Sequence, residues 1–281
     1  MAKGTRKQVS ALAPWFGSNR LLGPKVGESL TGCEWVGVVF AGGMAEVPHI
    51  DAQTILVNDL HRGIINLATC IRQDHLRRPL LRRLRGTIFH PDELAEAQGI
   101  YSFDASSEIA KAWAFFVIAW MSRSGKAGTE SEANGSIATR WSATGGDSAV
   151  RFQSAIRSIA EWGRVFRRCT FETMDALEFL LRCEDKKGHG IYCDPPFPGA
   201  GRRYKHNAGK TDAEERKWHT RLRDGVQRFE QTRVVMRFYD HPLIRELYDP
   251  SRWDWKFLDG GKTQANETAP EVLLINRTEA K

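Results

Sequence analysis

The chain has 281 residues, with 41 Lys and Arg against 34 Asp and Glu, and therefore carries a net charge of +7. This length suits one large α/β domain with an insertion or two modest domains, and the excess positive charge fits a polyanionic partner. We expect no membrane association, because no apolar run is long enough to span a bilayer and no signal-peptide pattern opens the chain. The five cysteines have no paired spacing, so a reduced cytoplasmic protein without a metal site is expected.

An aromatic pair, Trp15 and Phe16, precedes a small turn that begins at Gly17. The pair predicts either a lid on a small-molecule pocket or a hydrophobic staple before a helix. The helix that follows is expected to turn three apolar residues inward: Leu21, Leu22 and Val26.

Two predicted strands then end in signals that are typical of nucleotide binding. The first, residues 35–40, runs into Gly42 and Gly43, and such glycines allow a ligand to approach the backbone closely. The second, residues 54–57, leads to Asp59, at the place where nucleotide-binding folds keep an acid for ribose hydroxyls. The alternative interpretation is that Asp59 caps the predicted helix 61–71, and both roles are compatible.

The middle of the chain is predicted to be helical. A run of arginines on a predicted helix is either a solvated face or a contact for backbone phosphates; its members are Arg72, Arg77, Arg78, Arg82, Arg83 and Arg85. Helix 106–121 has a broad apolar face that we interpret as core. A Gly- and Ser-rich stretch, 123–147, predicts a long loop that contains Arg140 and Trp141, and helix 149–166 follows.

After a predicted strand at 170–174 and a helix at 176–182, the chain reaches its most informative stretch. A short buried strand, residues 191–193, meets Asp194, Pro195, Pro196 and Phe197. The prolines end the strand and hold the chain extended, so a carboxylate and an aromatic ring are fixed close together. This pair suits a flat ring that bears an amino group, whereas the simpler interpretation is a turn with a capping Asp.

Two further features complete this stretch. Cys193 beside Asp194 is interpreted as a small core residue rather than as a nucleophile. A basic loop, 199–210, follows and contains Arg202, Arg203, Tyr204 and Lys205.

The remaining elements are a helix from the capping box at Thr211 to about 229, a strand at 232–239, a helix at 242–248, and strands at 253–258 and 271–276. Strands that alternate with helices and end in a pair of strands predict an α/β fold with a mostly parallel sheet.

Taken together, these motifs resemble those of the Dam-like, adenine-specific DNA methyltransferases. The resemblance includes the N-terminal aromatic and glycine motif, the cofactor loop at Phe40, Ala41, Gly42 and Gly43, the pair Asn58 and Asp59, the acid Asp175, and the motif from Asp194 to Phe197. The likeness covers nearly the whole chain and implies a Rossmann-like methyltransferase sheet with a C-terminal antiparallel hairpin. It also implies S-adenosyl-L-methionine as cofactor, double-stranded DNA as partner, and a bacterial or phage source.

The resemblance also implies roles for individual residues. Catalysis is assigned to Asp194, Pro195, Pro196 and Phe197. Cofactor binding is assigned to Trp15, Phe16, Gly17, Asn19, Phe40, Ala41, Gly42, Gly43, Asp59, Asp175 and Asp194. DNA binding is assigned to Arg77, Arg78, Arg140, Trp141, Arg202, Arg203, Tyr204 and Lys205. The catalytic domain is expected at 10–71 and 152–281, with an inserted, mainly helical target-recognition region at 72–151. The chain is expected to be a monomer, and a cognate restriction endonuclease is left open.

This chain departs from the family pattern at three places. Asn19 stands where the family has a cofactor-facing Lys, Val38 and Val39 replace a Glu-Pro pair, and Phe197 replaces the commoner Tyr. Two alternatives stay open. One is a DNA-binding relative with impaired cofactor binding, which fits Asn19 and the pair Val38 and Val39. The other is a methyltransferase that acts on RNA or a protein amide, against which Asp194 argues because such enzymes more often have Asn before the two prolines.

Overall fold

The computed structural model describes residue 9 and residues 11–17, 21–102, 106–123, 127–139, 147–258 and 270–278. These residues form two compact units. The helical unit contains the described residues of Met1–Leu21, Gly42–Pro48 and Arg62–Arg168, and the sheet unit contains those of Leu22–Ala41, His49–His61 and Cys169–Lys281. The predicted division into a catalytic domain and an insertion at 72–151 stays a prediction.

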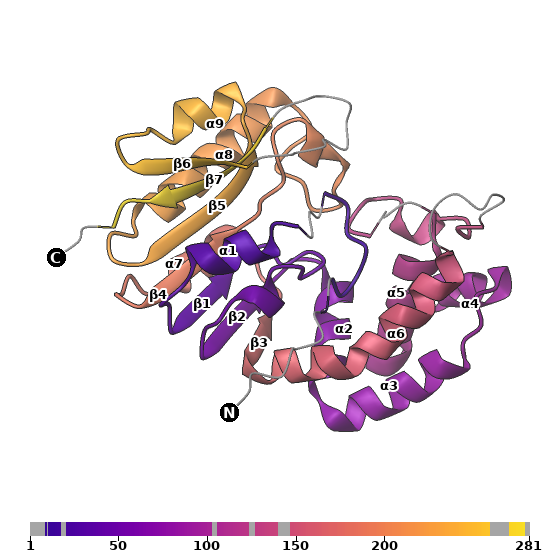
Figure 1. The fold of residues 1–281 in the computed structure, drawn as a ribbon. Coiled ribbons are helices and arrows are strands. Elements are labelled where there is room, and N and C mark those ends of the chain that lie inside the picture. The colour runs from indigo at the N-terminus through magenta and orange to yellow at the C-terminus, as the bar shows by residue number, and fades with distance from the viewer. Residues whose placement is uncertain are drawn as a thin grey trace. The chain divides into compact units, whose positions relative to one another are not determined.

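Within the described residues, the strands of the sheet unit form one seven-stranded sheet in the order β3-β2-β1-β4-β5-β7-β6 (Figure 1). The strands are β1 (Trp35–Val38), β2 (Thr54–Asn58), β3 (Cys169–Glu172), β4 (His189–Cys193), β5 (Arg233–Tyr239), β6 (Trp253–Leu258) and β7 (Glu271–Asn276). The first five strands pair in parallel, and β7 lies antiparallel between β5 and β6. The predicted α/β fold with a mostly parallel sheet is therefore confirmed.

Helices cover the sheet because its central strands are apolar on both faces, as parallel strands usually are. The helices of this unit are α1 (Gly23–Ser29), α7 (Ala176–Arg182), α8 (Asp212–Gln227) and α9 (Pro242–Leu247), with a short 3-10 helix η4 (Ala200–Arg203). Apolar side chains from α7, α8 and α9 pack in one cluster with alternate residues of β4, β5 and β7. The opposite face of β4 meets the end of α1, where a Cβ on Gly190 would lie 2.9 Å from the Cys33 sulfur.

The helical unit is organised around a buried helix, α5. Its α-helices are α2 (Arg62–Arg72), α3 (Asp74–Gly86), α4 (Pro91–Ser102), α5 (Glu108–Met121) and α6 (Ser148–Val165). The unit also contains the 3-10 helices η2 (Glu132–Asn134) and η3 (Phe166–Arg168). A third 3-10 helix, η1 (Val47–His49), spans the point in the sequence where one unit ends and the other begins. Every side chain from Ala112 to Ala119 is buried, including Trp113 and Phe116. The interpretation of this helix as core is confirmed.

The structure differs from the sequence-based expectations at two places in the first half of the chain. Leu22 and Val26 are buried as predicted, but Leu21 is 84% exposed. The reason is that a proline near its start begins α1 at Gly23, so that Leu21 lies outside the helix. In addition, no element is predicted between residues 85 and 106, but α4 occupies Pro91–Ser102, with Pro at its first position and acids in its first turn.

Two strands, β1 and β3, end earlier than predicted, and the side chain of Asn58 explains the difference. β1 ends at Val38 rather than at residue 40, and β3 ends at Glu172 rather than at residue 174. The buried amide of Asn58 donates to the carbonyls of Val39 and Met174 and accepts from the Met174 N–H, at 3.0–3.1 Å. Asn58 therefore takes over the hydrogen bonds that would continue the ladder.

Among the described helices, none is both long and apolar enough to cross a bilayer.

A buried histidine gives a prediction about stability. His219 of α8 is fully buried beside the ring of Phe238, and within the described residues neither of its nitrogens has a hydrogen-bond partner. The pKa of His219 is lowered to about 4. Burial is the main cause, Glu215 opposes it, and His241 contributes to the lowering. Since the unfolded chain binds this proton from about pH 6.5 downward, the free energy of unfolding should fall by about 3 kcal/mol as the pH falls from 6.5 to 4.

Denaturant titrations of the wild type and His219→Leu at several pH values measure this contribution. The difference between the two proteins isolates the effect of His219, because the other groups that titrate in the acid range are present in both. The wild type should lose more stability on acidification than the variant. His75→Asn, at an exposed position, is the control and should keep the wild-type slope. Parallel pH dependences for the wild type and His219→Leu would contradict the prediction.

Candidate active site

The candidate site begins at the carboxyl end of β4. β4 lies between β1 and β5, and the chain leaves β1 toward β2 on one side and β4 toward β5 on the other. In open α/β sheets ligands bind at such a reversal of strand order, outside the carboxyl ends of the strands. Asp194 directly follows β4, and Phe40 and Ala41 follow β1 by two and three residues. The sheet therefore places the predicted catalytic acid and part of the predicted cofactor loop at this point.

Backbone hydrogen bonds join these strand ends. The Val39 N–H donates to the Tyr192 carbonyl at 2.9 Å, and the Ala41 N–H donates to the Asn58 carbonyl at 3.0 Å. Together with the side-chain bonds of Asn58, they connect the ends of β1, β2, β3 and β4. Sequence reasoning placed Asn58 in a motif but did not assign it this role.

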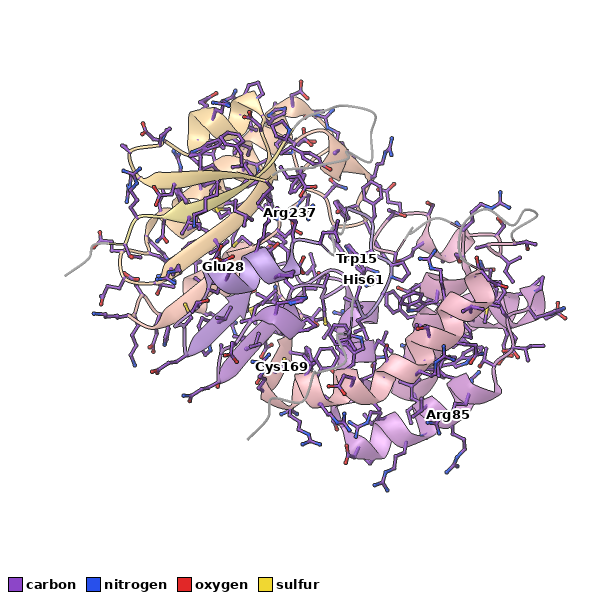
Figure 2. All side chains as sticks on the ribbon, in the orientation of Figure 1. Trp15, Glu28, His61, Arg85, Cys169 and Arg237 are labelled. Carbon is purple, nitrogen blue, oxygen red and sulfur yellow. The ribbon has the colours of Figure 1, made fainter. Side chains whose placement is uncertain are left out.

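Asp194 is held by a buried arginine. Arg237 of β5 is 1% exposed, and its Nη1 donates to Oδ2 of Asp194 at 2.8 Å. The same guanidinium contacts Glu271 of β7, with Nε and Nη2 at 3.2 and 3.1 Å from Oε2 (Figure 2 labels Arg237). Burial raises the pKa of Asp194, Arg237 opposes this effect, and Glu271 adds to it. Sequence reasoning missed Arg237 and Glu271; the available signal was an arginine inside the apolar run of β5.

Phe197 lies in the same cluster, but its ring is largely covered. The side chain is 9% exposed and belongs to the core between the sheet and α7–α9. Arg237 lies 5.3 Å from the ring centroid, and Tyr239 meets the ring edge-on at 4.6 Å. Pro195 and Pro196 are buried as well. The structure therefore brings the four predicted catalytic residues together, with a smaller exposed aromatic face than an open stacking surface would have.

Tyr204 joins this cluster electrostatically. Burial raises its pKa above the ordinary range, with smaller increases from Asp194, Tyr239 and Asp59 and an opposing effect of Arg237. Tyr204 therefore lies within electrostatic reach of Asp194 and Asp59, two of the three acids that the sequence analysis assigned to the site.

Two of the predicted cofactor acids also support local backbone structure. Oδ1 of Asp59 accepts the His61 N–H at 2.8 Å, which is the geometry of an Asx turn just before α2. Asp175 is exposed and is the N-cap of α7, where it accepts from Leu177 and Glu178. A capping role is present at both acids, and ligand binding by them stays a prediction.

The basic loop after the motif is fastened to α8. The guanidinium of Arg202 pairs with Asp212 and with the buried Glu215, which also accepts the Gly199 N–H at 2.9 Å. The predicted capping box at Thr211 is confirmed and closes the loop at its far end. Arg203 and Lys205 are exposed. Arg202 is thus engaged within the chain, and DNA contact by this loop stays a prediction for all three residues.

In the helical unit, the indole of Trp15 packs against glycines of the predicted cofactor loop. A Cβ on Gly42 would lie 3.0 Å from the indole, and one on Gly43 would lie 2.7 Å from the Ala13 carbonyl oxygen. Gly128 also approaches the ring, since a Cβ at this position would lie 2.5 Å from it. The structure therefore brings Trp15 and the two glycines together. Phe16 and Gly17 follow directly, and Asn19 lies outside the described residues.

The predicted DNA-binding arginines of α3 divide into two groups. Arg77 bonds to Asp74 and to the Ile71 carbonyl, and Arg83 pairs with Glu96 and lies 3.7 Å over the ring of Trp113. The exposed residues lie three or four positions apart, on one face of the helix, and form what we call the arginine stripe: Arg78, Arg82 and Arg85 (Figure 2 labels Arg85). Arg140 and Trp141 lie outside the described residues.

The cysteines and the possible metal ligands were also located in the fold. All five cysteines are buried and none forms a disulfide bond with another, and burial raises the pKa of Cys193 well above its ordinary value. The described part of the chain contains no group of three or more His, Cys, Asp or Glu residues with the arrangement of a metal site.

A comparison of the chain with models of known protein families gives no match, and a comparison with curated proteins gives none either. The functional interpretation of this site therefore depends on its residues and geometry.

Proposed function

We propose that this chain is an adenine-specific DNA methyltransferase that transfers the methyl group of S-adenosylmethionine to the exocyclic amino group of a flipped adenine. The observation that carries the proposal is the position of Asp194, Pro195, Pro196 and Phe197 at the carboxyl end of β4, where the strand order reverses. The resemblance to Dam-like enzymes supports the same proposal and implies that the sheet is of the Rossmann-like methyltransferase kind.

The residues at the strand ends fit the cofactor. Asp59 and Asp175 are oriented by backbone N–H groups that bond to Oδ1 of each. Carboxylates in these positions suit the ribose hydroxyls and the adenine amino group of the cofactor. When bound, S-adenosylmethionine would supply a methyl group that its sulfonium has already activated.

The chemical task of the protein is then positioning and electrostatic stabilisation. The lone pair of an adenine amino group is delocalised into the ring. Hydrogen bonds from the two N–H groups to the Asp194 carboxylate and the Pro195 carbonyl would draw the nitrogen toward tetrahedral geometry and free the lone pair. The nitrogen gains positive charge during transfer, and the Asp194 carboxylate would stabilise it.

The target base must leave the helix before it can reach Asp194. Flipping costs a few kcal/mol, and stacking on an aromatic ring at about 1–3 kcal/mol returns part of it. Phe197 is the assigned ring, and Tyr204 would line the same place.

The first prediction concerns catalysis. Asp194→Ala should lower methyl transfer to DNA by about 10²-fold or more, because it removes the group that accepts the amino hydrogen and faces the developing charge. The fold should persist, because Arg237 keeps its contacts to Glu271. Transfer of radiolabelled methyl groups to DNA measures the effect, with thermal unfolding as the control. Turnover near the wild-type value would contradict the assignment, and preferential labelling of RNA would favour the alternative substrate class.

The second prediction concerns the cofactor. Asp59→Ala should weaken S-adenosylmethionine binding by about 1–3 kcal/mol through the loss of charge-assisted hydrogen bonds to the ribose diol. Asp249→Ala is a matched control, because Asp249 forms the same kind of turn by accepting the Ser251 N–H at 2.6 Å. Calorimetry should show weaker binding for the first variant and unchanged binding for the second. Equal affinities in all three proteins would leave Asp59 as a turn residue without a role in cofactor binding. If the wild type does not bind S-adenosylmethionine, the alternative of a DNA-binding relative with impaired cofactor binding would be favoured.

The third prediction concerns the arginine stripe. If Arg78, Arg82 and Arg85 contact backbone phosphates, each substitution to Gln should lower the salt slope of DNA affinity by about one unit, whatever the DNA sequence. Arg182→Gln is the control, because Arg182 is exposed and paired with Glu178 on α7. Salt titrations of binding to random duplexes provide the measurement. Slopes that match the wild type would make the stripe a solvated helix face.

A further inference from the structure

The ion cluster around Asp194 contains more negative charge than its arginine requires. Arg237 is 1% exposed and Glu271 is 4% exposed. A buried guanidinium needs a carboxylate partner, and one would suffice to neutralise it. Here Asp194 and Glu271 both contact it, so the three side chains carry one net negative charge when all of them are ionised. A second buried carboxylate has a desolvation cost, which calls for an explanation.

The sheet fixes the arginine and the second carboxylate relative to each other. Glu271 pairs with Tyr239 in the antiparallel register of β5 and β7, and Arg237 lies two residues before Tyr239 on the same face of β5. Two nitrogens of the guanidinium point to Glu271, and Nη1 remains for Asp194. Asp194 follows Cys193, which pairs with Met236, the residue before Arg237. The guanidinium is therefore anchored within strands and presents one donor to Asp194.

This arrangement has two consequences for the Asp194 carboxylate. The bond from Nη1 engages Oδ2 and restrains the carboxylate, and Oδ1 would accept from a substrate donor. An arginine that paired with Asp194 alone would cancel its charge. Glu271 shares the guanidinium and restores a net negative charge beside the reacting nitrogen.

We infer that Arg237 and Glu271 are positioning residues of the methyl-transfer site: Arg237 orients the Asp194 carboxylate, and Glu271 offsets the guanidinium charge. This inference rests on the proposed function. In the transfer, the amino nitrogen lone pair forms the bond to the methyl carbon while the carbon–sulfur bond breaks and leaves its electron pair on sulfur. The nitrogen then releases one proton, and the Asp194 carboxylate is its acceptor. A cluster with net negative charge favours both the developing cation and this proton transfer.

Other titratable side chains around the cluster must be accounted for in a pH experiment. Those that interact with Asp194 or Arg237 are Tyr192, Cys193, Tyr204 and Tyr239, and Asp59 acts on Tyr204. The pKa values of Cys193, Tyr204 and Tyr239 are raised, mainly by burial. These three groups stay protonated in the acid range, so a change there reports on the carboxylates.

The test is Glu271→Gln, which keeps nearly the same shape and removes the charge. Because Glu271 raises the pKa of Asp194, the variant should lower it. The acid limb of the pH profile of kcat should shift to lower pH, and kcat on the plateau should fall about tenfold while KM for S-adenosylmethionine stays constant. Glu246→Gln is the control, because Glu246 forms an exposed pair with Arg216, and it should change neither quantity.

A second readout does not depend on activity. Carbon-13 NMR of aspartate-labelled protein, with the Asp194 signal assigned by Asp194→Asn, gives the titration midpoint of Asp194 directly. The midpoint should be lower in Glu271→Gln than in the wild type. Arg237→Lys keeps the positive charge but cannot bond to Asp194 and Glu271 with the geometry of a guanidinium. The value of kcat should therefore fall, while the Asp194 midpoint should be closer to the wild-type midpoint than it is in Glu271→Gln.

The outcomes separate the two proposals. A wild type that methylates DNA, with an unchanged midpoint and profile in Glu271→Gln, would overturn the inference alone. A wild type that transfers no methyl group to DNA, with the predicted shift of the midpoint, would overturn the proposed function and the catalytic consequence while the charge coupling stands.

Discussion

A buried guanidinium holds the candidate site together. Arg237 lies in the strand next to β4 and bonds to the acid that follows β4 and to an acid at the start of β7. Because its charge is buried, the guanidinium needs a carboxylate partner, and both Asp194 and Glu271 contact it. The ring of Phe197 packs beside the same guanidinium. One side chain therefore fixes both the carboxylate and the aromatic ring of the proposed catalytic motif.

The strand ends around this cluster are kept in register by a second buried polar group. Asn58 satisfies backbone groups beyond β1 and β3, so these strands stop where the site begins. Asp59 can then turn toward α2 within the next residues. Polar groups that end the strands, together with a charge cluster that orients the acid, form the kind of rigid support that positional catalysis requires.

Much of the fold could be predicted from local sequence signals. The bounds of β6 and β7, the capping box at Thr211 and the proline at the start of α9 follow from patterns that act over a few residues. The aspartate of the proposed catalytic motif was also identifiable, since two prolines after a buried strand are unusual. Arg237 was not, because its partners lie 43 and 34 residues away along the chain. The engagement of Arg202 with Glu215 depends in the same way on how the loop folds back onto α8.

We propose that this chain methylates adenine in DNA. The most direct measurement is modified-base sequencing of DNA from a methylation-free host that expresses the chain, beside DNA from the same host expressing the Asp194→Ala variant. The account predicts methyladenine at one recurring sequence with the wild type and none with the variant. Unmodified DNA in cells that contain the folded wild-type protein would contradict it.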